Sequence, residues 1–439
     1  MDVPAKIIFN DICAYFVKSK TMDFDINCKM LRFQNERLLE KGDISFIRRL
    51  QNWDVYARNY GALRNVNILT ENEADDAEEC KKFLIKAADW VYPIERIQLA
   101  GERCILFLKR TTVIETLLRQ VLGDSSNSGL LYGKHKKNTL RYVYVHKNPK
   151  LIEVASKDLT QYRVKILTEV LIRLLRYSEW NLLDELSTDE VFGELLQLSL
   201  RSVNTPKEVE DPNILEITCG LVKDPVTGKM ATMSLDEYFE VRGAEMRLAA
   251  MHKYGLRFNQ MDFKAILEQL STAAVTVDLL GKNPASDAKI LHNGIGSSRG
   301  ASFILYNSAR IETLLRRFDD EVRKGKYEDL PDLNQVDLSL LTKEEEWQIL
   351  FGYVFAFPHL IDECLASLKK GQCSVNLIEQ YLKGLASSIS VYYQRIKILT
   401  DSREHLMPYI YARIYLMKAA QLVLNKALGL LNIPPMHHM

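Results

Sequence analysis

The chain contains few side chains whose types and spacing could support catalysis. Its eight histidines lie at positions 135, 146, 252, 292, 359, 405, 437 and 438. None of them belongs to an HExxH metal-binding motif or to a close cluster with carboxylates. The glycine-rich stretch GIGSSRG (294–300) lacks the spacing of a dinucleotide- or phosphate-binding loop, and there is no GxSxG nucleophile motif. These absences favour a binding function over an enzymatic one.

Positive charge is concentrated in one segment of an otherwise nearly neutral chain. The net formal charge is +1, yet residues 131–176 carry eleven Lys and Arg residues against three acids. In the densest part, GKHKKNTLRYVYVHKNPK, Tyr142 and Tyr144 are interleaved with the cations. Basic side chains mixed with aromatic ones are typical of surfaces that bind phosphates and stacked bases. A basic surface that is only solvated explains the same pattern, so both interpretations stay open.

A second concentration of cations and aromatic residues lies near the C-terminus. Residues 347–439 hold nine basic and five acidic side chains. The candidate binding residues there are Tyr392, Tyr393, Arg395, Lys397, Arg413, Lys418 and Lys426. For each tyrosine, a position in a core fits the pattern as well as a position that stacks on a base.

The stretch SFILYNSARIETLLRRF (302–318) has the periodicity of an amphipathic helix. Side chains that are four, three and four residues apart lie on one face of a helix, and here they make a polar stripe of Tyr306, Arg310, Thr313 and Arg317. The opposite stripe, which we expect to face a core, consists of Ile304, Ile311, Leu315 and Phe318. Arg310 binds either a carboxylate of a neighbouring helix or an RNA phosphate, and the pattern leaves both alternatives open.

The elements that must position these residues can be predicted from local patterns. YPIERIQLAGERCILFLKRT (92–111) predicts a β-hairpin that turns at Ala100 and Gly101. TLRYVYVH (139–146) predicts a strand, and residues 158–180 predict a long helix capped by Asp158. ILEITCGLV (214–222) predicts a buried strand, and a further long helix follows Ser234. Residues 262–280 fit either a helix or a helix followed by a strand. From Phe303 onward we expect helices, interrupted by an acidic linker at 319–346.

The bulk properties indicate a folded chain of about three domains, at roughly 150 residues each. Of the 439 residues, 47% are hydrophobic and 26% are charged, which is typical of globular proteins. We predict an α+β domain at 1–125, an α/β domain at 130–295 and a helical domain at 296–439. GDSSNSG (123–129) has the composition of the linker between the first two.

The cysteines and the apolar segments bear on the location of the protein. Seven cysteines without a CxxC pair argue against a secreted disulfide framework. The N-terminus lacks the pattern of a secretory signal. The longest apolar run, FGYVFAFPHLI, is too short to span a bilayer and contains a proline. We therefore expect reduced thiols, no metal site and a cytoplasmic location.

The C-terminal segments also resemble a known family. The Tyr-x-x-Ala-Arg segment at 306–310 is similar to the start of the anticodon-binding helix bundle of class I arginyl-tRNA synthetases. EEEWQILFGYVFAFPHLIDECL, SVYYQRIKIL and ARIYLMKAAQLVLNKALGLLNIPPM continue this resemblance in order. The last segment is similar to the helix and ending that give the DALR domain its name, although it reads Ala412-Arg413-Ile414 and Leu431-Asn432-Ile433. The resemblance covers about 303–439.

A weaker resemblance to these synthetases extends towards the N-terminus. IERIQLAGERCILFLKRT is similar to the end of their N-terminal tRNA-elbow domain, and YVYVHKNPK with the next helix is similar to their first catalytic strand and helix. Where the synthetases carry a His-x-Gly-His loop, this chain reads LIEVASKDLTQYR. Where they carry paired lysines for ATP phosphates, Lys229 stands alone. Both departures predict that aminoacylation is lost.

An anticodon domain beside a degenerate active site resembles the family of DALR anticodon-binding domain-containing protein 3. CGLVKDPVTGKMATMSLDEYFEVRGAEMRLAAMHKYG and SSRGASFILYNSAR carry this resemblance. It implies an α+β multi-domain, arginyl-tRNA synthetase-like fold with a reduced Rossmann-like α/β centre and an all-α DALR bundle. It also implies a non-catalytic subunit, without a cofactor, that binds arginine tRNAs. The implied partner, methyltransferase-like protein 2, forms 3-methylcytidine at position 32 of the anticodon loop.

With this resemblance, the cations and tyrosines above become candidate tRNA contacts, because anticodon loops are read by stacking and by hydrogen bonds to base edges. The predicted tRNA-binding residues are Tyr306, Arg310, Arg317, Tyr392, Tyr393, Arg395, Lys397, Arg413, Lys418, Lys426, Lys134, Lys136, Lys137 and Arg141. Two alternative functions stay open. One is a divergent arginyl-tRNA synthetase, and the other is a protein-interaction scaffold that does not bind RNA.

Overall fold

The computed structural model describes residues 3–19, 24, 29–69, 76–123, 131–146, 158–186, 192–206, 211–254, 264–290 and 298–436. Contacts divide the chain into two compact units. Unit 1 comprises Met1–His135, Leu315–His359 and Ser388–Val423. Unit 2 comprises Lys136–Leu314, Leu360–Ser387 and Leu424–Met439.

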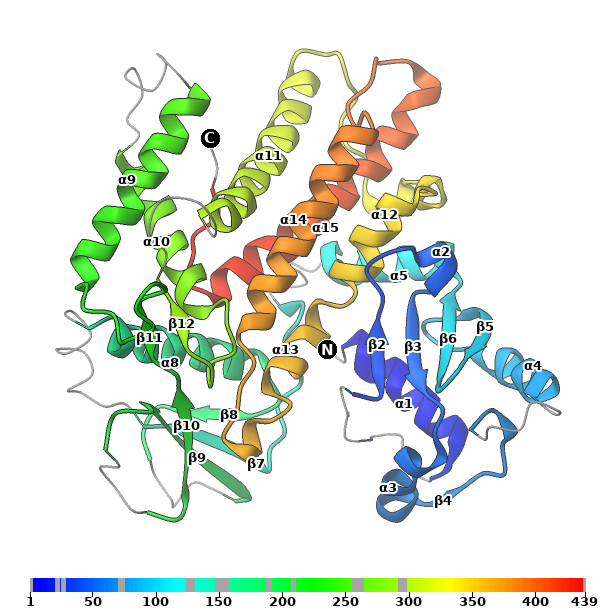
Figure 1. Ribbon diagram of the computed structural model, residues 1–439. Coiled ribbons are helices and arrows are strands. Elements are labelled where there is room, and N and C mark those ends of the chain that lie inside the picture. Colours follow the sequence, from blue (N-terminus) through cyan, green and yellow to red (C-terminus); the bar gives the residue numbers. More distant parts are fainter. Residues whose placement is uncertain are drawn as a thin grey trace. The chain divides into compact units, whose positions relative to one another are not determined.

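The first part of unit 1 is built on an antiparallel sheet (Figure 1). Its strands, in spatial order, are β2 (Leu31–Phe33), β3 (Ile44–Ile47), β6 (Arg103–Leu108) and β5 (Ile94–Ala100). β5 pairs with β6 up to Ala100 and Arg103, which confirms the predicted hairpin. Gly101 in the turn has a φ of +53°, a left-handed conformation that favours glycine. β1 (Val17–Lys18) pairs separately with β4 (Ala62–Leu63).

Helices pack with this sheet around an aromatic core. They are α1 (Pro4–Phe16), α2 (Leu38–Lys41), α3 (Leu50–Tyr60), η1 (Asn67–Leu69), α4 (Asp76–Ala87) and α5 (Arg110–Leu122). Phe16, Phe46, Trp53 and Phe83 are fully buried, and the rings of Phe16 and Trp53 lie 4.9 Å apart. Burying an aromatic ring contributes about 1.5–3 kcal/mol, so this cluster is a main source of stability for the sheet.

The rest of unit 1 is helical. It contains the end of α11 (Ser298–Arg323), η4 (Leu333–Gln335), η5 (Leu338–Leu340), α12 (Glu344–Ile349), the π-helix η6 (Leu350–Val354), the end of α14 (Asn376–Arg395), η8 (Glu404–Leu406) and most of α15 (Met407–Leu430). α11 runs on to Arg323 and α12 begins at Glu344, so the predicted linker at 319–346 was wrong at both ends. Asp319, Asp320 and Glu321 lie in the last turns of α11. Glu344, Glu345 and Glu346 lie in the first turn of α12, where their negative charge interacts favourably with the helix dipole.

A close backbone approach within unit 1 involves the π-helix. A Cβ atom on Gly352 would lie 2.8 Å from the Cα of Asn35, so only glycine fits there. Beside it, the guanidinium of Arg110 lies 4.1 Å from the ring centre of Trp347. The Tyr132 hydroxyl donates a hydrogen bond to the Val354 carbonyl at 2.6 Å. The segment after β2, α5 and Tyr132 therefore pack against α12 and the π-helix.

Unit 2 contains a parallel sheet (Figure 1). Its strands, in spatial order, are β10 (Ile214–Cys219), β9 (Glu194–Ser202), β7 (Arg141–Val145) and β8 (Asn181–Leu183). The chain runs from β7 through α8 (Leu159–Tyr177) to β8 and then returns to β9 on the other side of β7. The strand order therefore switches between β7 and β9. The predicted strands at 139–146 and 214–222 and the helix at 158–180 are confirmed, whereas β8 and β9 were not predicted.

Short strands and helices complete unit 2. They are β11 (Val222–Lys223), α9 (Leu235–Tyr254), α10 (Lys264–Leu280), β12 (Ala288–Lys289), the start of α11, part of α13 (Phe357–Leu365), η7 (Leu368–Lys370) and parts of α14 and α15. The predicted helix after Ser234 forms, and Ser234 caps it in a reciprocal capping box with Glu237 at 2.8 and 3.3 Å. α10 is helical to Leu280, which settles the alternative left open for 262–280.

The described residues form no disulfide, and no single helix among them is long and apolar enough to cross a membrane. Only the bent pair Glu344–Val354 and Phe357–Lys370, taken together, meets that test, by length and composition alone. Five of the six described cysteines are buried. Within the same part of the chain, no group of three or more His, Cys, Asp or Glu side chains could hold a metal ion.

Candidate nucleic-acid interface

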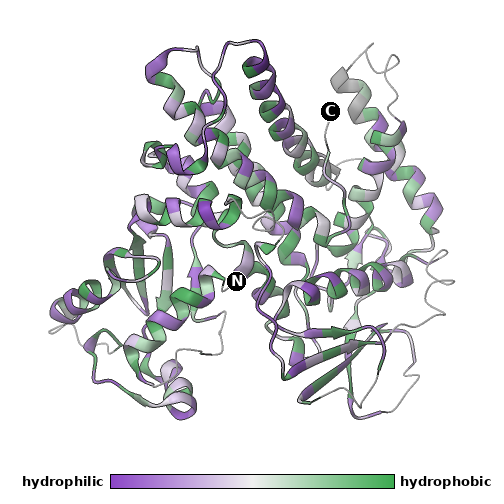
Figure 2. Ribbon diagram, turned by 180° about the vertical axis from the view of Figure 1, so that it is seen from behind, coloured by the Kyte–Doolittle hydropathy of each residue, from purple (hydrophilic) through white to green (hydrophobic). Residues whose placement is uncertain are grey.

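The polar stripe of α11 forms as predicted. Tyr306 and Arg310 are half-buried and Arg317 is exposed, whereas Ile311 on the opposite face is fully buried. Figure 2 shows hydrophilic and hydrophobic residues along the length of this helix. The Arg310 guanidinium donates to the Tyr306 hydroxyl at 2.8 Å, lies 4.5 Å from that ring centre and donates to Asn307 Oδ1 at 3.3 Å. These contacts of Arg310 all lie on its own helix.

We expect the loss of these three contacts in Arg310→Ala to lower the free energy of unfolding by about 1–1.5 kcal/mol. Contacts between residues four apart on one helix contribute a few tenths of a kcal/mol, and an exposed cation–π contact contributes about 0.5–1 kcal/mol. Arg317→Ala, at an exposed position, should change stability by less than about 0.5 kcal/mol. Urea unfolding measures both effects. If Arg310→Ala abolished folding, the guanidinium would instead be a structural partner of a neighbouring helix.

A buried carboxylate binds two of the predicted RNA contacts. Glu346 lies in the first turn of α12 and is fully buried. Its Oε1 accepts hydrogen bonds from Arg413 Nε at 3.3 Å and from the Tyr392 hydroxyl at 3.1 Å. Its Oε2 accepts from the Lys343 backbone N–H at 2.9 Å. Burial, and then the charge of Glu346, raise the pKa of Tyr392 well above its usual value. This Glu346 network joins α12, α14 and α15.

The Glu346 network corrects the predictions for Tyr392 and Arg413. Tyr392 is fully buried, so its ring cannot stack on a base. The Arg413 side chain is 14% exposed, and its Nη1 donates to the Lys397 carbonyl at 3.3 Å. If Arg413 left this pair to bind a phosphate, the Glu346 carboxylate would stay charged and unpaired in the interior, which is strongly unfavourable. Tyr393, the next residue, is 40% exposed, and its stacking role stays a prediction.

Exposed cations and tyrosines lie around the α14–α15 loop. We call this group the bundle-tip surface, and its members are Arg317, Tyr393, Lys397, Arg403 and Tyr409. The Tyr327 hydroxyl donates to the Thr400 carbonyl in the loop at 2.5 Å. The Tyr327 ring also stacks on Phe318 of α11 at 5.8 Å, within a cluster that includes the first turns of α15. These contacts bring the end of α11 to the loop.

Several other cations at the bundle tip have carboxylate partners. Arg395 donates to Glu345 at 2.7 Å, and this bond lowers the pKa of Glu345. Glu321 binds Lys326 at 2.7 Å and Lys324 at 3.2 Å. Among the described residues, Arg317 and Lys397 of the bundle-tip surface make no ion pair. Of the predicted contacts here, these two are therefore the best placed to bind phosphate, and Arg395 must first release Glu345.

Sequence reasoning missed Arg403 and Tyr409. Both are exposed, Arg403 before η8 and Tyr409 in the first turn of α15. The Arg413 guanidinium lies 5.7 Å from the Tyr409 ring, which connects this side of the surface to the Glu346 network. The signal was available, because the polar stretch DSREH between two long helices predicts a loop that presents its side chains to solvent.

Lys418 and Lys426 are half-buried on α15, and each faces a tyrosine ring. Lys418 Nζ lies 5.6 Å from the ring centre of Tyr415, whose hydroxyl donates to the Pro331 carbonyl at 2.6 Å. Lys426 Nζ lies 5.4 Å from the ring centre of Tyr177 at the end of α8. Lys418 belongs to unit 1 and Lys426 to unit 2.

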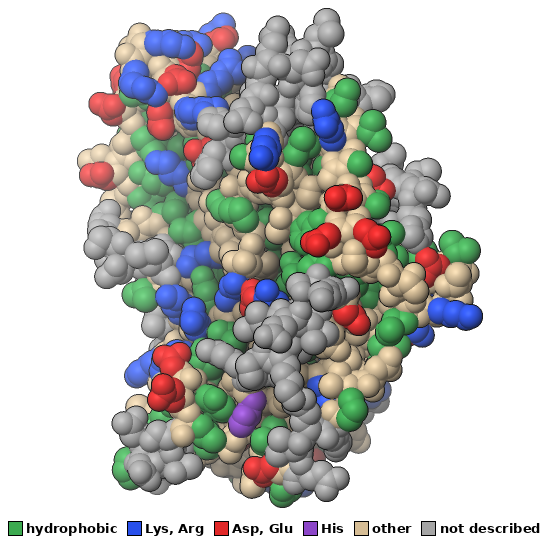
Figure 3. All heavy atoms as spheres, turned by 90° about the vertical axis from the view of Figure 1, so that its left-hand side faces the viewer, with side chains coloured by type: hydrophobic (Ala, Val, Ile, Leu, Met, Phe, Trp, Pro, Cys, Tyr) green, Lys and Arg blue, Asp and Glu red, His purple; other side chains and the backbone are tan. Residues whose placement is uncertain are grey.

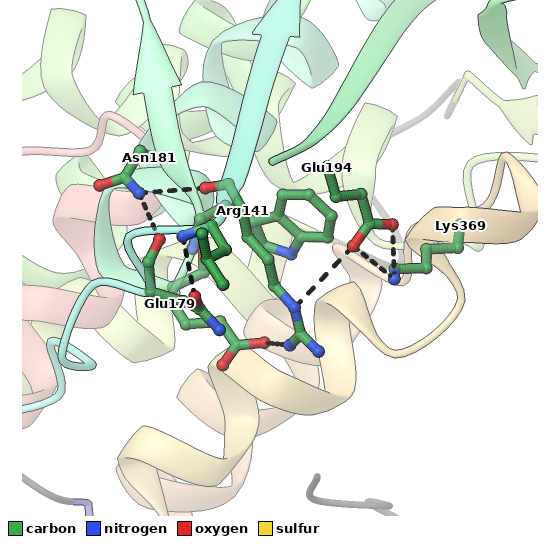
Figure 4. Close-up of polar contacts among 9 residues, drawn as sticks. Arg141, Glu179, Asn181, Glu194 and Lys369 are labelled. Atoms are coloured by element: carbon green, nitrogen blue, oxygen red, sulfur yellow. Dashed lines mark hydrogen bonds and ion pairs between the residues drawn. The ribbon is translucent and has the colours of Figure 1, made fainter. Parts of the chain in front are cut away.

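Lys137 and Arg141 are bound by their own surroundings, which corrects both predictions. Lys137 Nζ donates to the carbonyls of Leu175, Ser178 and Trp180 at 3.1, 2.8 and 2.7 Å. These bonds use all three ammonium protons and neutralise the negative end of α8. Arg141 forms an ion pair with Glu179 and lies 3.9 Å from Glu194 (Figure 4). Lys134, in unit 1, is half-buried, and Lys136, in unit 2, is exposed and still predicted to bind RNA.

At the carboxyl edge of the parallel sheet, where doubly wound sheets bind ligands, polar groups satisfy one another. The Asp158 carboxylate accepts the N–H groups of Thr160 and Gln161 at 2.6 and 3.2 Å. Arg163 is fully buried and donates to the carbonyls of Leu279, Gly220 and Ser286 at 2.7, 2.9 and 2.8 Å. A carboxylate at this helix N-terminus opposes the binding of a phosphate. Part of the segment that departs from the His-x-Gly-His pattern, residues 151–157, lies outside the described residues.

The sign of the surface charge varies over short distances. On the face drawn in Figure 3, Lys and Arg side chains lie among acidic and hydrophobic ones. This mixture agrees with the net charge of +1 for the chain. Any attraction for a polyanion must therefore come from local groups such as the bundle-tip surface.

The family of the DALR anticodon binding domain matches residues 304–439. We refer to residues 304–439 as the DALR domain. The DALR domain includes nearly all of α11, the Glu346 network and the bundle-tip surface. The resemblance inferred from residues 303–439 is confirmed.

The chain is also similar to proteins that are named after this domain. It is 29% identical over 230 residues to DALR anticodon-binding domain-containing protein 3 of Danio rerio, across 50% of this chain and 40% of that protein. The protein of the same name from Rattus norvegicus is 30% identical over 230 residues, across 51% and 42%. The chain thus spans about two fifths of the length of these relatives. An arginine–tRNA ligase of Treponema pallidum is 30% identical over 179 residues, across 40% of this chain and 28% of the ligase.

Solved arginyl-tRNA synthetases share the fold of the chain. The synthetase of Plasmodium falciparum superposes with a TM-score of 0.62 and 11% identity, over 99% of this chain and 98% of that one. The Thermus thermophilus synthetase has a TM-score of 0.54 and 11% identity, over 93% and 96%. The predicted fold is confirmed: it is arginyl-tRNA synthetase-like, with a parallel sheet in its central region and a helical DALR domain at the C-terminus.

Proposed function

We propose that the chain is a cytoplasmic, non-catalytic adaptor that binds arginine tRNAs. The observation that carries this proposal is the DALR domain, whose tip exposes two tyrosines and three cations around one loop. Splayed loop bases stack on exposed aromatic rings, while cations hold the backbone and set its register. The relatives named arginine–tRNA ligase support arginine tRNAs as the ligand class.

As an adaptor, the chain presents the bound tRNA to a partner enzyme. We infer that this partner is methyltransferase-like protein 2 and that the reaction is 3-methylcytidine formation at position 32 of the anticodon loop. Support comes from the similarity to DALR anticodon-binding domain-containing protein 3 over about half of the chain. The binding energy then supplies proximity and orientation, and the partner supplies the chemistry.

Filter binding with purified arginine tRNA and with a non-arginine tRNA tests the binding step. We expect tighter binding of the arginine tRNA at physiological salt. Binding should weaken by about 0.7 log units per log unit of salt for each phosphate neutralised. Equal affinity for both tRNAs would contradict the arginine-specific form. Failure to bind any tRNA would favour the scaffold alternative.

A reconstituted methylation assay tests the adaptor step. We expect arginine tRNA to gain 3-methylcytidine at position 32 when the methyltransferase and this chain are both present, and not when either is omitted. Copurification after RNase treatment shows whether the two proteins bind directly. Full methylation by the enzyme alone would contradict an adaptor role.

The second candidate function is a divergent arginyl-tRNA synthetase, which the shared fold and the similarity to the ligase of Treponema pallidum favour. The Asp158 carboxylate at the N-terminus of α8 and the buried Arg163 oppose it, because they occupy the sheet edge with internal bonds. We expect no arginine-dependent exchange between ATP and pyrophosphate when tRNA is present. Exchange above the background without protein would overturn the non-catalytic assignment.

A further inference from the structure

The end of α8 gathers cations from separate segments of unit 2. Lys137 precedes β7 and binds the last carbonyls of the helix. Lys369 of η7 lies with its Nζ 5.5 Å from the ring centre of Trp180, and Lys426 of α15 lies 5.4 Å from that of Tyr177. We call the surface around residues 175–181 the α8-end surface.

The carboxylates of the α8-end surface balance only some of its cations. Figure 4 shows Glu179 beside Arg141, and Glu194 between Arg141 and Lys369. The negative charges of Glu179 and Glu194 therefore balance the positive charges of Arg141 and Lys369. Beyond that balanced set, Lys136, Arg176 and Lys370 are exposed and bring three further positive charges.

The end of α8 does not itself repel an anion. The last carbonyls of a helix carry a partial negative charge. Here Lys137 binds the carbonyls of Leu175, Ser178 and Trp180 and so cancels that charge. A phosphate that approaches the surface therefore meets a net positive potential.

The size and composition of the surface favour backbone contacts. Residues 175–177 end α8 and residues 178–180 connect it to β8, so this stretch with its flanking lysines is longer than one helical turn of about 5.4 Å. A nucleic-acid strand carries a phosphate about every 3.4 Å along a duplex, so a surface of this length meets more than one. Trp180 is 7% exposed and offers no open ring to a base. Lysines act as point charges, which position a backbone without reading sequence.

We propose that the α8-end surface binds the phosphate backbone of tRNA outside the anticodon stem–loop. This inference rests on the proposed function, because it takes tRNA as the ligand. The bundle-tip surface and the α8-end surface then have different tasks: the first reads the anticodon loop, and the second holds the tRNA body.

Charge reversal of the two exposed lysines, in the variant Lys136→Glu/Lys370→Glu of the full chain, tests this assignment. The probes are a full-length arginine tRNA transcript and its isolated anticodon stem–loop. We expect the affinity for full-length tRNA to fall about tenfold, with a salt slope shallower by about 1.4, because two phosphates are no longer neutralised at ~0.7 each. The affinity for the isolated stem–loop should stay unchanged.

The matched control is Lys282→Glu/Lys289→Glu, which makes the same charge change at exposed positions near β12. We expect it to leave the affinity for full-length tRNA within twofold of the wild type. Three results would overturn the inference. The test variant could bind full-length tRNA as tightly as the wild type, the control variant could lose as much affinity as the test variant, or the test variant could lose as much affinity for the stem–loop as for full-length tRNA.

Two further outcomes separate this inference from its premises. If the wild type binds neither probe, the proposed function fails, and the inference fails with it. If the wild type binds stem–loop and full-length tRNA equally well, the proposed function stands and this inference fails.

Binding to vesicles that contain phosphatidylserine tests whether the α8-end surface binds a membrane instead. Vesicle binding that the test variant loses, with its tRNA affinity intact, would assign the surface to membranes and overturn the inference.

Discussion

Arg413→Ala is expected to lower the free energy of unfolding by about 3–5 kcal/mol, because it leaves the carboxylate of Glu346 buried and unpaired. Glu346 has no exposed surface, and Arg413 is the cation that contacts it at 3.3 Å. The substitution also removes the hydrogen bond to the Lys397 carbonyl, which holds the chain after α14. Urea unfolding at neutral pH measures the loss.

Arg395→Ala is the matched control for this prediction. Arg395 pairs with the adjacent acid, Glu345, but its side chain is 68% exposed, so we expect a loss below about 1 kcal/mol. A double variant that replaces Arg413 and Glu346 with leucine should be more stable than Arg413→Ala, because no buried charge remains. If Arg413→Ala cost no more stability than the control, Arg413 would be available to bind RNA.

Reversing two of the three cations of the bundle-tip surface, in Arg317→Glu/Lys397→Glu, is expected to weaken tRNA binding at least about tenfold. Both side chains are exposed and make no ion pair among the described residues, so they can bind phosphate without breaking an internal contact. The salt dependence should become shallower by about 1.4, from two phosphates at ~0.7 each. Filter binding across a salt series measures both quantities.

This variant should also lose affinity for the isolated anticodon stem–loop, which distinguishes the bundle-tip surface from the α8-end surface. The matched control, Lys324→Glu/Lys326→Glu, changes charge on the same part of unit 1 at lysines that are paired with Glu321. We expect a smaller loss for the control. An equal loss would mean that only the overall charge of this region matters.

Long regular elements of this fold could be predicted because their signals are local. The apolar spacing between 158 and 180 and the cap residue Asp158 define α8. β8 could not be predicted in the same way, because it has only three residues, all half-buried. β9 was missed although its residues alternate between half-buried and buried from Gln197 to Ser202, a signal that the sequence offered. Their strand conformation depends on pairing with β7, which is a contact between distant segments.

The candidate site was predictable by region but not residue by residue. Tyr392 and Tyr393 are neighbours in sequence, yet they point about 100° apart around α14, and only one of them faces solvent. Which one is buried depends on Glu346, 46 positions away. Similarly, Lys137 and Arg141 contribute to a basic composition, but their carbonyl and carboxylate partners follow α8. Composition identifies a cationic segment and does not show which of its charges are already satisfied.

The π-helix at Leu350–Val354 lets the chain carry an extra residue in this region. A π turn accommodates one residue more than an α-helical turn. Deleting one residue here would restore an α-helical turn and leave the following residues at nearly the same angle around the helix axis. Phe355, Phe357 and His359 would therefore stay buried against their partners. The change would fall on Gly352, whose backbone would shift from its close approach to Asn35. A homologue with one residue fewer between Trp347 and His359 therefore needs no compensating insertion nearby.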